Sequence, residues 1–279
     1  MDAPELYRRI AGEADRGELV FPTHAEVGLR IKRALDDPDC STDQAAKLIQ
    51  AEPLLAARVV AMANSVAYNR SGREISDVRQ AVARLGFRTL RSLTMSLLVR
   101  QISGQPANPE HKALAQRLWE HTAHVAALAH VIARRVTHQD PETALFAGIL
   151  HEVAGFYLIS RAQDAPELLA GIPPGWQGEG EAVVGAALFK VLAVPEPAAA
   201  AIVDLWQGYL AIPPVSLGDT LLLAEELAPV ASPLYWAPAR DAAEEAGTPQ
   251  IEMAIDQETL TSILAESADE VRSLIEALK

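Results

Sequence analysis

The sequence predicts an all-α protein, and three observations support this fold class. Alanine, leucine, glutamate and arginine are frequent, apolar residues recur at steps of three and four, and no stretch shows the sustained alternation of β-branched residues that strands favour. The chain of 279 residues is 49% hydrophobic, which is enough to bury a substantial core in one or two lobes. A disordered tail and a disulfide-stabilised miniprotein are therefore excluded.

Capping boxes mark the first helices of the chain. Thr23, with a glutamate three residues later, starts a helix that ends in the Asp-rich turn at residues 36–39. Ser41, with a glutamine at the same spacing, starts a second helix that ends before Pro53. Residues 1–18 precede these helices as an N-terminal extension.

A third helix runs to Asn64, and the polar residues 69–76 after it predict a loop. Ser76 is the expected N-cap of a long helix that follows this loop. A stretch rich in glycine and proline near residue 105 interrupts all periodicity, so we place a lobe boundary there. Residues 19–105 then form an N-terminal helical lobe, and residues 106–228 form a second helical lobe.

Two polar residues of the second lobe stand in apolar helical stripes. His121 lies in a stripe of leucine, valine and isoleucine at steps of four and three, and Glu152 lies in a similar stripe after Pro141. Both side chains are therefore expected to point inward. After a Gly/Pro-rich loop, shorter helices are expected at residues 181–192, 197–210 and 216–228.

Residues 229–279 comprise an irregular acidic linker and a final amphipathic helix that begins at Asp256. Leucine and valine repeat there with strict four-three spacing, as in a narrow heptad seam. We favour docking of this helix onto the body of the protein, because fewer than four heptads are short for a coiled coil. A homodimer through the C-terminal helix is the alternative.

Basic side chains concentrate in one part of an acidic chain. Residues 1–100 hold 15 Lys and Arg against 13 Asp and Glu, whereas residues 101–279 hold 9 against 24. Residues 70–100 alone carry a net charge of +5. Some of these basic side chains form a candidate site for an anion or an acidic partner. The alternative explanation is a helix face that is simply exposed to solvent. The candidate residues are Arg70, Arg73, Arg84, Arg88 and Arg91, the last three at helical spacing of four and three.

The composition also limits which cellular compartment and which classes of partner are expected. Cys40 is the only cysteine, so an intrachain disulfide cannot form, and a reducing compartment fits. The N-terminus has no apolar leader, and no apolar run approaches the ~18 residues of a membrane span. We therefore expect a cytoplasmic protein with no membrane contact. The net charge of −13 repels a phosphate backbone, so nucleic acid is not an expected partner.

From about residue 19 to residue 228 the sequence resembles the HDOD domain, a non-catalytic relative of the HD phosphohydrolases. Five segments in the family's order carry the resemblance: FPTHAEVGLRI with the following DDPDCS, EPLLAARVVAMANSVAY, ISDVRQAVARLGFRTLRSL, LWEHTAHVAALA and ETALFAGILHEVAGFYLI. The resemblance implies an HD-like helical bundle. It also implies a signal-transduction output module that binds a protein partner and needs no cofactor.

The resemblance places His121, His151, Glu152 and Asp219 at the metal-ligand positions of active HD phosphohydrolases. There, imidazoles and carboxylates hold a divalent cation that activates water. In this chain Glu152 replaces the aspartate of the His-Asp pair, and its extra methylene is expected to displace the ligating oxygen by about 1 Å or more. Gly155 stands where catalytic relatives have a lysine. We therefore expect no metal and no catalytic residue, with His121 and Glu152 as a buried hydrogen-bonded pair.

Motifs of other enzyme classes are missing: the sequence has no Walker-type loop, no Gly-x-Ser-x-Gly elbow and no Gly-rich dinucleotide turn. Two alternatives to the output module remain. One is a residual metal-dependent phosphohydrolase or phosphodiesterase that uses the four HD positions. The other is a sensor that binds a nucleotide second messenger at the arginines or at the lobe interface without hydrolysing it.

Overall fold

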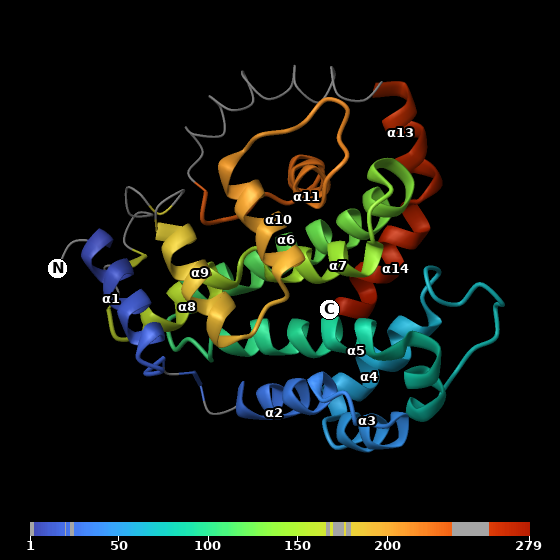
Figure 1. Cartoon of the computed structure of the whole chain (residues 1–279), viewed down its shortest axis with the longest axis horizontal. Helices are drawn as coiled ribbons and strands as arrows, with labels where there is room; N and C mark the ends of the chain where they lie inside the picture. Colours follow the sequence, from blue (N-terminus) through green and yellow to red (C-terminus); the bar gives the residue numbers. More distant parts are fainter. Residues whose placement is uncertain are drawn as a thin grey trace.

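The computed structural model describes residues 3–19, 21–22, 25–165, 168–169, 176, 180–235 and 257–279, and the predicted all-α class is confirmed (Figure 1). The regular structure of these residues is helical throughout. The helices before residue 105 are α1 (Ala3–Asp15), α2 (Ala25–Asp36), α3 (Thr42–Gln50), α4 (Pro53–Asn64) and α5 (Val78–Ile102).

The helices after residue 105 include one short π-helical turn that continues α6. They are α6 (Pro109–Ile132), the π-helix η1 (Ala133–Thr137), α7 (Pro141–Leu150), α8 (Val153–Arg161), α9 (Glu181–Val191), α10 (Glu196–Gln207), α11 (Leu217–Glu226), α13 (Gln257–Glu266) and α14 (Ala268–Leu278). The expected helices at 181–192, 197–210 and 216–228 correspond to α9, α10 and α11.

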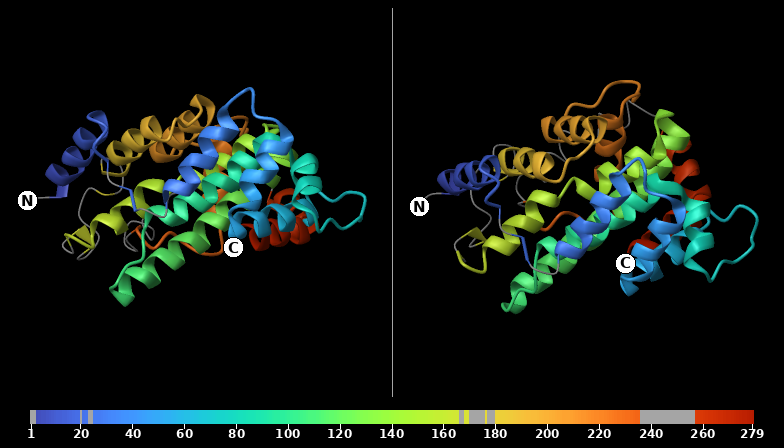
Figure 2. Two further views of the ribbon diagram at one scale, coloured as in Figure 1. Left: turned by 90° about the horizontal axis from the view of Figure 1, so that it is seen from below. Right: turned by 60° about the horizontal axis from the view of Figure 1, so that its bottom comes forward.

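Helix α5 lies at the centre of the fold. Helices α2, α3 and α4 pack on one side of it, and α7 and α8 pack on the other (Figures 1 and 2). Its second half is buried almost all round, from Ser92 to Val99, as expected for a helix between two layers. A single hydrophobic cluster runs from Tyr7 to Leu278. The two sides of the predicted boundary near residue 105 therefore share one core, and the division into lobes stays a prediction.

Local sequence signals account for several helix ends. The predicted capping box of Ser41 is present, and Pro53 occupies the first turn of α4. The predicted start at Thr23 lies outside the described residues. The prediction of Ser76 as an N-cap is wrong, because the side chain of Asp77 accepts the hydrogen bond from the Gln80 amide instead.

Three expected continuous helices are interrupted. Gly86 has φ 73° and ψ 169°, which breaks α5 between its first two turns and the rest. His151 and Glu152 form a turn between α7 and α8, so Glu152 is not inside a helix. The C-terminal helix is divided at Ser267, which has φ −100° and ψ 3°.

The C-terminal helix docks onto its own chain. Helix α14 packs on α4 and α6, and Leu274 and Leu278 are fully buried there. The carboxylate of Glu270 also pairs with Arg134 of the π-helix. The apolar face of α14 is therefore covered within one chain, and a homodimer through the C-terminal helix stays a prediction.

Among the residues that the structure describes, one apolar stretch is long enough to cross a membrane by length and composition. It covers residues 141–161, and 83% of its most apolar window is buried inside the protein. The stretch spans α7 and α8, which pack against α5 and α6. Its apolar composition is explained by its place in the core.

Candidate functional site

A cluster of ionisable side chains lies inside the second half of the chain. Helix α6 contributes His121, whose side chain is completely buried. The Nδ1 atom of His121 lies 2.7 Å from the carbonyl oxygen of Val230, so Nδ1–H donates to that oxygen. The Nε2 atom of the same ring therefore faces the interior of the cluster.

The second imidazole is oriented in the same way. His151, in the turn after α7, is 1% exposed, and its Nδ1 lies 2.7 Å from the carbonyl oxygen of Gly148. Its Nε2 lies 3.0 Å from Nε2 of His121. Because both Nδ1 atoms face acceptors, the two Nε2 atoms can approach this closely only when a proton or another cation separates their lone pairs.

Glu225 of α11 is the main carboxylate partner of the histidines. Its Oε2 lies 3.1 Å from Nε2 of His121 and 3.5 Å from Nε2 of His151. Burial alone would lower the pKa of His121, but Glu225 and then Glu152 raise it to about 9. Burial, reinforced by the charge of His121, lowers the pKa of His151 to about 4. These opposite shifts favour His121 over His151 as the ring that carries a proton.

The expected hydrogen bond between His121 and Glu152 is not formed. The nearest carboxylate oxygen of Glu152 lies 3.9 Å from Nε2 of His121, beyond hydrogen-bond range. Neither of its oxygens has a hydrogen-bond partner among the described residues, although the side chain is fully buried. Burial accordingly raises the pKa of Glu152, against the lowering effect of His121 and the nearby Ser232 hydroxyl.

A third carboxylate enlarges the cluster. Glu181, the first residue of α9, is 2% exposed, and both its oxygens lie 3.4 Å from the Tyr235 hydroxyl, which donates to them. Burial, together with the charges of Glu152 and Glu225, raises the pKa of Glu181 well above its usual range. The cluster thus combines two imidazoles with three carboxylates, and burial raises the pKa of two of these acids, Glu152 and Glu181, which favours their neutral forms.

The segment after α11 covers this cluster. Val230 binds His121 through its carbonyl, Tyr235 contacts Glu181, and Ser232 and Leu234 are both buried. At Gly155, where catalytic relatives have a lysine, an added Cβ would overlap the Cδ1 atom of Leu234. Three cavities of the described part of the chain are lined by other residues. Glu225, which contacts both histidines, keeps a side chain that is 19% exposed, so the cover over the cluster is partial.

The donor set is nevertheless compatible with a divalent cation. His121, His151 and Glu152 offer ligand atoms that all lie within 4.8 Å of one another. The carboxylate of Glu152 therefore stays within the group, and the expected displacement of its ligating oxygen by the extra methylene stays a prediction. Metal-binding histidines commonly donate their second ring N–H to a carbonyl oxygen, as both rings do here. A cation held by these residues would acidify water or polarise a phosphoryl oxygen.

Asp219 does not belong to the cluster, although the resemblance placed it at the last ligand position. Its carboxylate accepts hydrogen bonds from the backbone amides of Ala211, Val215 and Ser216 and from the Ser216 hydroxyl, all at 2.8–2.9 Å. Asp219 therefore caps α11 and fixes the preceding loop. The carboxylate that reaches the histidines comes from Glu225, two turns of helix nearer the C-terminal end of α11.

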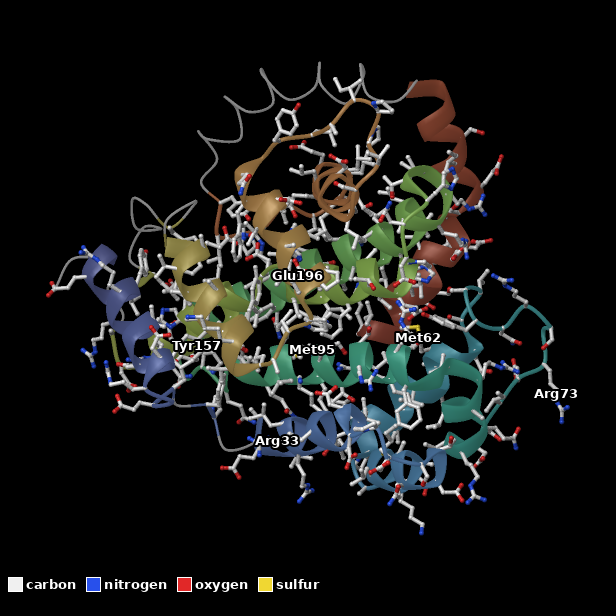
Figure 3. The ribbon with its side chains drawn as sticks, in the orientation of Figure 1. Arg33, Met62, Arg73, Met95, Tyr157 and Glu196 are labelled. Atoms are coloured by element: carbon white, nitrogen blue, oxygen red, sulfur yellow. The ribbon has the colours of Figure 1, made fainter. Side chains whose placement is uncertain are left out.

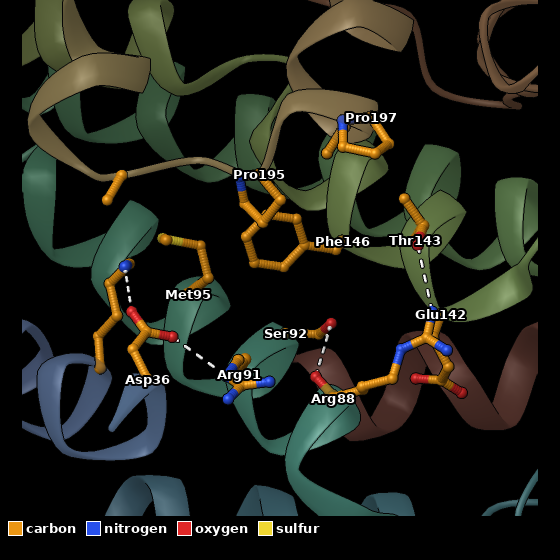
Figure 4. A pocket seen from close by; sticks show the side chains of 13 residues that line it. Asp36, Arg88, Arg91, Ser92, Met95, Glu142, Thr143, Phe146, Pro195 and Pro197 are labelled. Atoms are coloured by element: carbon orange, nitrogen blue, oxygen red, sulfur yellow. Dashed lines mark hydrogen bonds and ion pairs between the residues drawn. The ribbon is translucent and has the colours of Figure 1, made fainter. Parts of the chain in front are cut away.

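Arg84, Arg88 and Arg91 do not lie on one continuous helix, because the break at Gly86 separates Arg84 from the other two. Arg84 donates to the backbone oxygens of Ala63 and Arg73 and thereby holds the loop between α4 and α5. The other candidates fall into two groups. Arg73 lies on that loop, which projects from the body (Figure 3), and both Arg70 and Arg73 are exposed. Arg88 and Arg91 line a cavity between helices (Figure 4).

Comparisons with known proteins agree with this architecture. The sequence model of the HDOD domain matches residues 21–172, more than half of the chain. No curated protein matches the chain.

Three crystal structures have the same fold at low sequence identity. A protein from Shewanella amazonensis, provisionally named a metal-dependent phosphohydrolase, is 19% identical, with a TM-score of 0.69 over 99% of each chain. An HDOD domain protein of unknown function from Geobacter sulfurreducens is 23% identical, with a TM-score of 0.61 over 99% of each chain. A provisionally named signal transduction protein from Marinobacter aquaeolei is 19% identical, with a TM-score of 0.59 over 99% of this chain and 66% of that one.

Proposed function

Because the chain belongs to the HDOD domain family, we propose that it is a cytoplasmic signal-transduction output module that acts by binding a protein partner and does not turn over a substrate. The observation that carries this proposal is the cover over the histidines. His121, His151 and Glu152 are each at most 1% exposed, and the segment of residues 230–235 lies against them. Hydrolysis of a phosphate ester needs a substrate oxygen at that position.

The protonation of the cluster supports the same proposal. The raised pKa of His121, about 9, places a proton where a catalytic cation would otherwise stand, between the two Nε2 atoms and the carboxylate of Glu225. A buried charge pair of this kind is retained when removal of one member leaves the other unpaired, at a cost of about 3–5 kcal/mol. The cluster then has a structural role, linking α6, the turn after α7, and α11.

The loop between α4 and α5 is the surface that we assign to the partner. Arg70 and Arg73 are exposed on it, and it projects away from the helices (Figures 1 and 3). The chain as a whole carries a net charge of −13, whereas in this loop Arg70 and Arg73 balance Glu74 and Asp77, so the loop itself is neutral. Guanidinium groups bind carboxylates in bidentate fashion, which fits a partner with an acidic surface.

Affinity purification from the native cell tests this assignment when wild type is compared with two variants. The double variant Arg70→Glu, Arg73→Glu is expected to lose the co-purified partner. Arg117→Glu, which changes an exposed arginine of α6, is expected to retain it. Equal recovery of the same partner with the double variant would remove this loop from the interface.

A second function, metal-dependent phosphohydrolysis, is favoured by the grouping of His121, His151 and Glu152 within 4.8 Å. The name of the Shewanella neighbour points the same way. Metal analysis separates the two proposals. If protein purified without chelator holds no stoichiometric metal, and Mn²⁺ or Fe²⁺ does not raise its unfolding temperature, this second function fails.

A further inference from the structure

Another cavity lies at the lobe boundary that the sequence predicts near residue 105. It has a volume of about 750 Å³. Its lining comes from the end of α5 and the segment after it, from the first half of α6, and from single residues of α8 and of the chain after α14. Pockets that bind small molecules enclose about 300–1,000 Å³, so the volume is sufficient for a guest of metabolite size.

Basic side chains outnumber acidic ones in this lining. Arg100, Lys112 and Lys279 stand against the single carboxylate of Glu120, which leaves an excess of +2. Glu120 lies 4.0 Å from the Lys279 amine and is the acid nearest to it. Among the described residues, no acidic side chain forms an ion pair with Arg100 or Lys112. Two of the three cations therefore lack a counter-charge in that part of the chain.

A buried arginine next to the lining adds to this charge. Arg58 of α4 is 4% exposed, and its Nη2 donates to the backbone oxygen of Lys279 at 3.1 Å. Arg100 donates to the same oxygen at 2.8 Å, so two guanidinium groups converge on one atom. The Nε and Nη1 atoms of Arg58 are buried, and no described residue accepts a hydrogen bond from them. Burial and then the charge of Arg100 lower the pKa of Arg58 to about 10.

The positive excess does not depend on the group that Lys279 presents to the two arginines. A terminal carboxylate at this residue is balanced by Arg58, which is not itself a lining residue. The lining then keeps its excess of +2. Because buried charge without a partner is costly, an anion that enters the cavity reduces that cost.

The rest of the lining holds Arg100 in place and offers hydrogen bonds. The guanidinium of Arg100 lies over the Trp119 ring, 5.2 Å from its centroid, and Trp119 packs against Phe156. A side chain held in this way loses little conformational entropy when it binds a guest. Gln105 and Gln116 contribute amides, which can both donate to and accept from hydroxyl groups.

We propose that this cavity binds a small organic phosphate, with the phosphate group on Arg100 and Lys112 and a sugar or nucleoside body against the two glutamines. The charge favours phosphate, because a phosphate monoester carries about −1.5 to −2 at neutral pH, whereas a carboxylate supplies a single charge. Guanidinium groups also bind phosphate oxygens in bidentate fashion. Trp119 and Phe156 are 6% and 1% exposed, so the body of the guest meets polar groups more than aromatic faces.

This effector site goes beyond the partner-binding proposal and does not rest on it. The cavity is bordered by residues of α5, α6 and α8 and by Lys279 after α14. A bound phosphate would therefore hold the end of the docked C-terminal helix against the helices on both sides of the predicted boundary. It would also place a negative charge beside the paired guanidinium groups of Arg58 and Arg100.

Isothermal titration calorimetry of the wild-type protein tests the proposal with adenosine monophosphate, ribose 5-phosphate, ribose and inorganic phosphate as probes. A chelator in the buffer prevents binding through a metal ion at the histidines. Both organic phosphates are expected to bind, and ribose, which has no phosphate, is expected to give no heat. Inorganic phosphate, which lacks the body, is expected to bind at least about tenfold more weakly. The ratio of the two organic affinities distinguishes a nucleotide from a sugar phosphate.

Three variants locate the phosphate group. Arg100→Gln and Lys112→Gln each remove one cation of the lining and are expected to weaken both organic phosphates about tenfold, as loss of one charge-assisted contact does. Lys112 is exposed, so its replacement is expected to leave the fold intact. Arg117→Gln makes the same change of charge at an exposed position of α6 outside the lining, and is expected to bind like wild type.

No binding of either organic phosphate at millimolar concentration would overturn the proposal. Equal affinities of wild type, Arg100→Gln and Lys112→Gln would do the same. An equal loss in Arg117→Gln would also overturn it, because the protein would then respond to overall charge alone. Each of these results leaves the partner-binding proposal standing, because that proposal rests on the histidine cluster and on the loop that carries Arg70 and Arg73.

Discussion

The Nε2 atoms of His121 and His151 lie 3.0 Å apart, and each ring donates its Nδ1–H to a backbone carbonyl oxygen. This geometry is shared by a metal site and by a protonated histidine pair, because both place a positive charge between two nitrogen lone pairs. The carboxylate of Glu225 favours that charge in either case. Whether a metal ion or a proton lies between the two Nε2 atoms decides between the proposed functions.

The protonated pair predicts a dependence of stability on pH. The pKa of His121 is raised from 6.5 to about 9, so the folded state binds a proton that the unfolded state releases between these values. This contribution to stability is complete below pH 6.5 and is lost as the pH rises through 9. We expect the free energy of unfolding, measured by urea titration with chelator, to fall by on the order of 2 kcal/mol between pH 7 and pH 9.

The variant His121→Gln is the control for that measurement. It cannot take up the proton, so its stability is expected to change much less over the same interval, although it is lower at pH 7. Parallel curves for the two proteins would assign the pH dependence to other groups.

Asp219 is expected to matter for stability and not for metal binding. Replacement by alanine removes a capping box and leaves the amides of Ala211 and Val215 without their acceptor, at a cost of about 3 kcal/mol. Urea unfolding measures the loss, and Asp164→Ala, at an exposed position, is expected to stay within about 0.5 kcal/mol of wild type. An Asp219→Ala protein of normal stability would contradict this structural role.

Gly148 permits the close approach of α7 to α6. A Cβ at this position would lie 2.6 Å from the Cα atom of Ala126, and backbone cannot yield as a side chain can. Gly148→Ala is therefore expected to lower the melting temperature, with a cost of about 1–3 kcal/mol. Gly12→Ala in α1 provides the opposite case, because its Cβ meets only the flexible end of Arg16 at 3.2 Å. Higher helix propensity should make that variant neutral or more stable.

The docked C-terminal helix predicts that its leucines stabilise a single chain. Leu274→Ala is expected to cost about 2–5 kcal/mol, because the side chain is fully buried, whereas Glu276→Ala at an exposed position should have little effect. Light scattering distinguishes docking from self-pairing. A mass that halves on Leu274→Ala, with the fold retained, would show that the helix had joined two chains.

The helical class, most helix positions and the inward orientation of His121 could be predicted, because they depend on local periodicity. The interruptions could not. The spacing of apolar residues around Glu152 is the same for one continuous helix as for two helices joined by a turn. The turn between α7 and α8 therefore leaves no trace in the sequence pattern. Likewise, Gly86 is a tolerated residue within a helical pattern, and only its positive φ separates Arg84 from the arginines of the cavity.

The composition of the cluster was only partly predictable. His121, His151 and Glu152 were identified, and the structure brings them together. Glu225 was missed, because a glutamate near the end of a helix resembles a solvated residue unless its position four residues after Leu221 is followed along the stripe. Tyr235 lies in an irregular segment without periodicity, so no local signal indicates that its hydroxyl reaches Glu181.

Turnover assays decide whether the covered histidines have a catalytic role. Purified protein is incubated with Mn²⁺ and either cyclic dinucleotides or nucleotides, alongside the variant His151→Ala. We predict no metal-dependent product from wild type above the level of the variant. Metal-dependent hydrolysis by wild type that His151→Ala abolishes would contradict the account of this protein as a binding module.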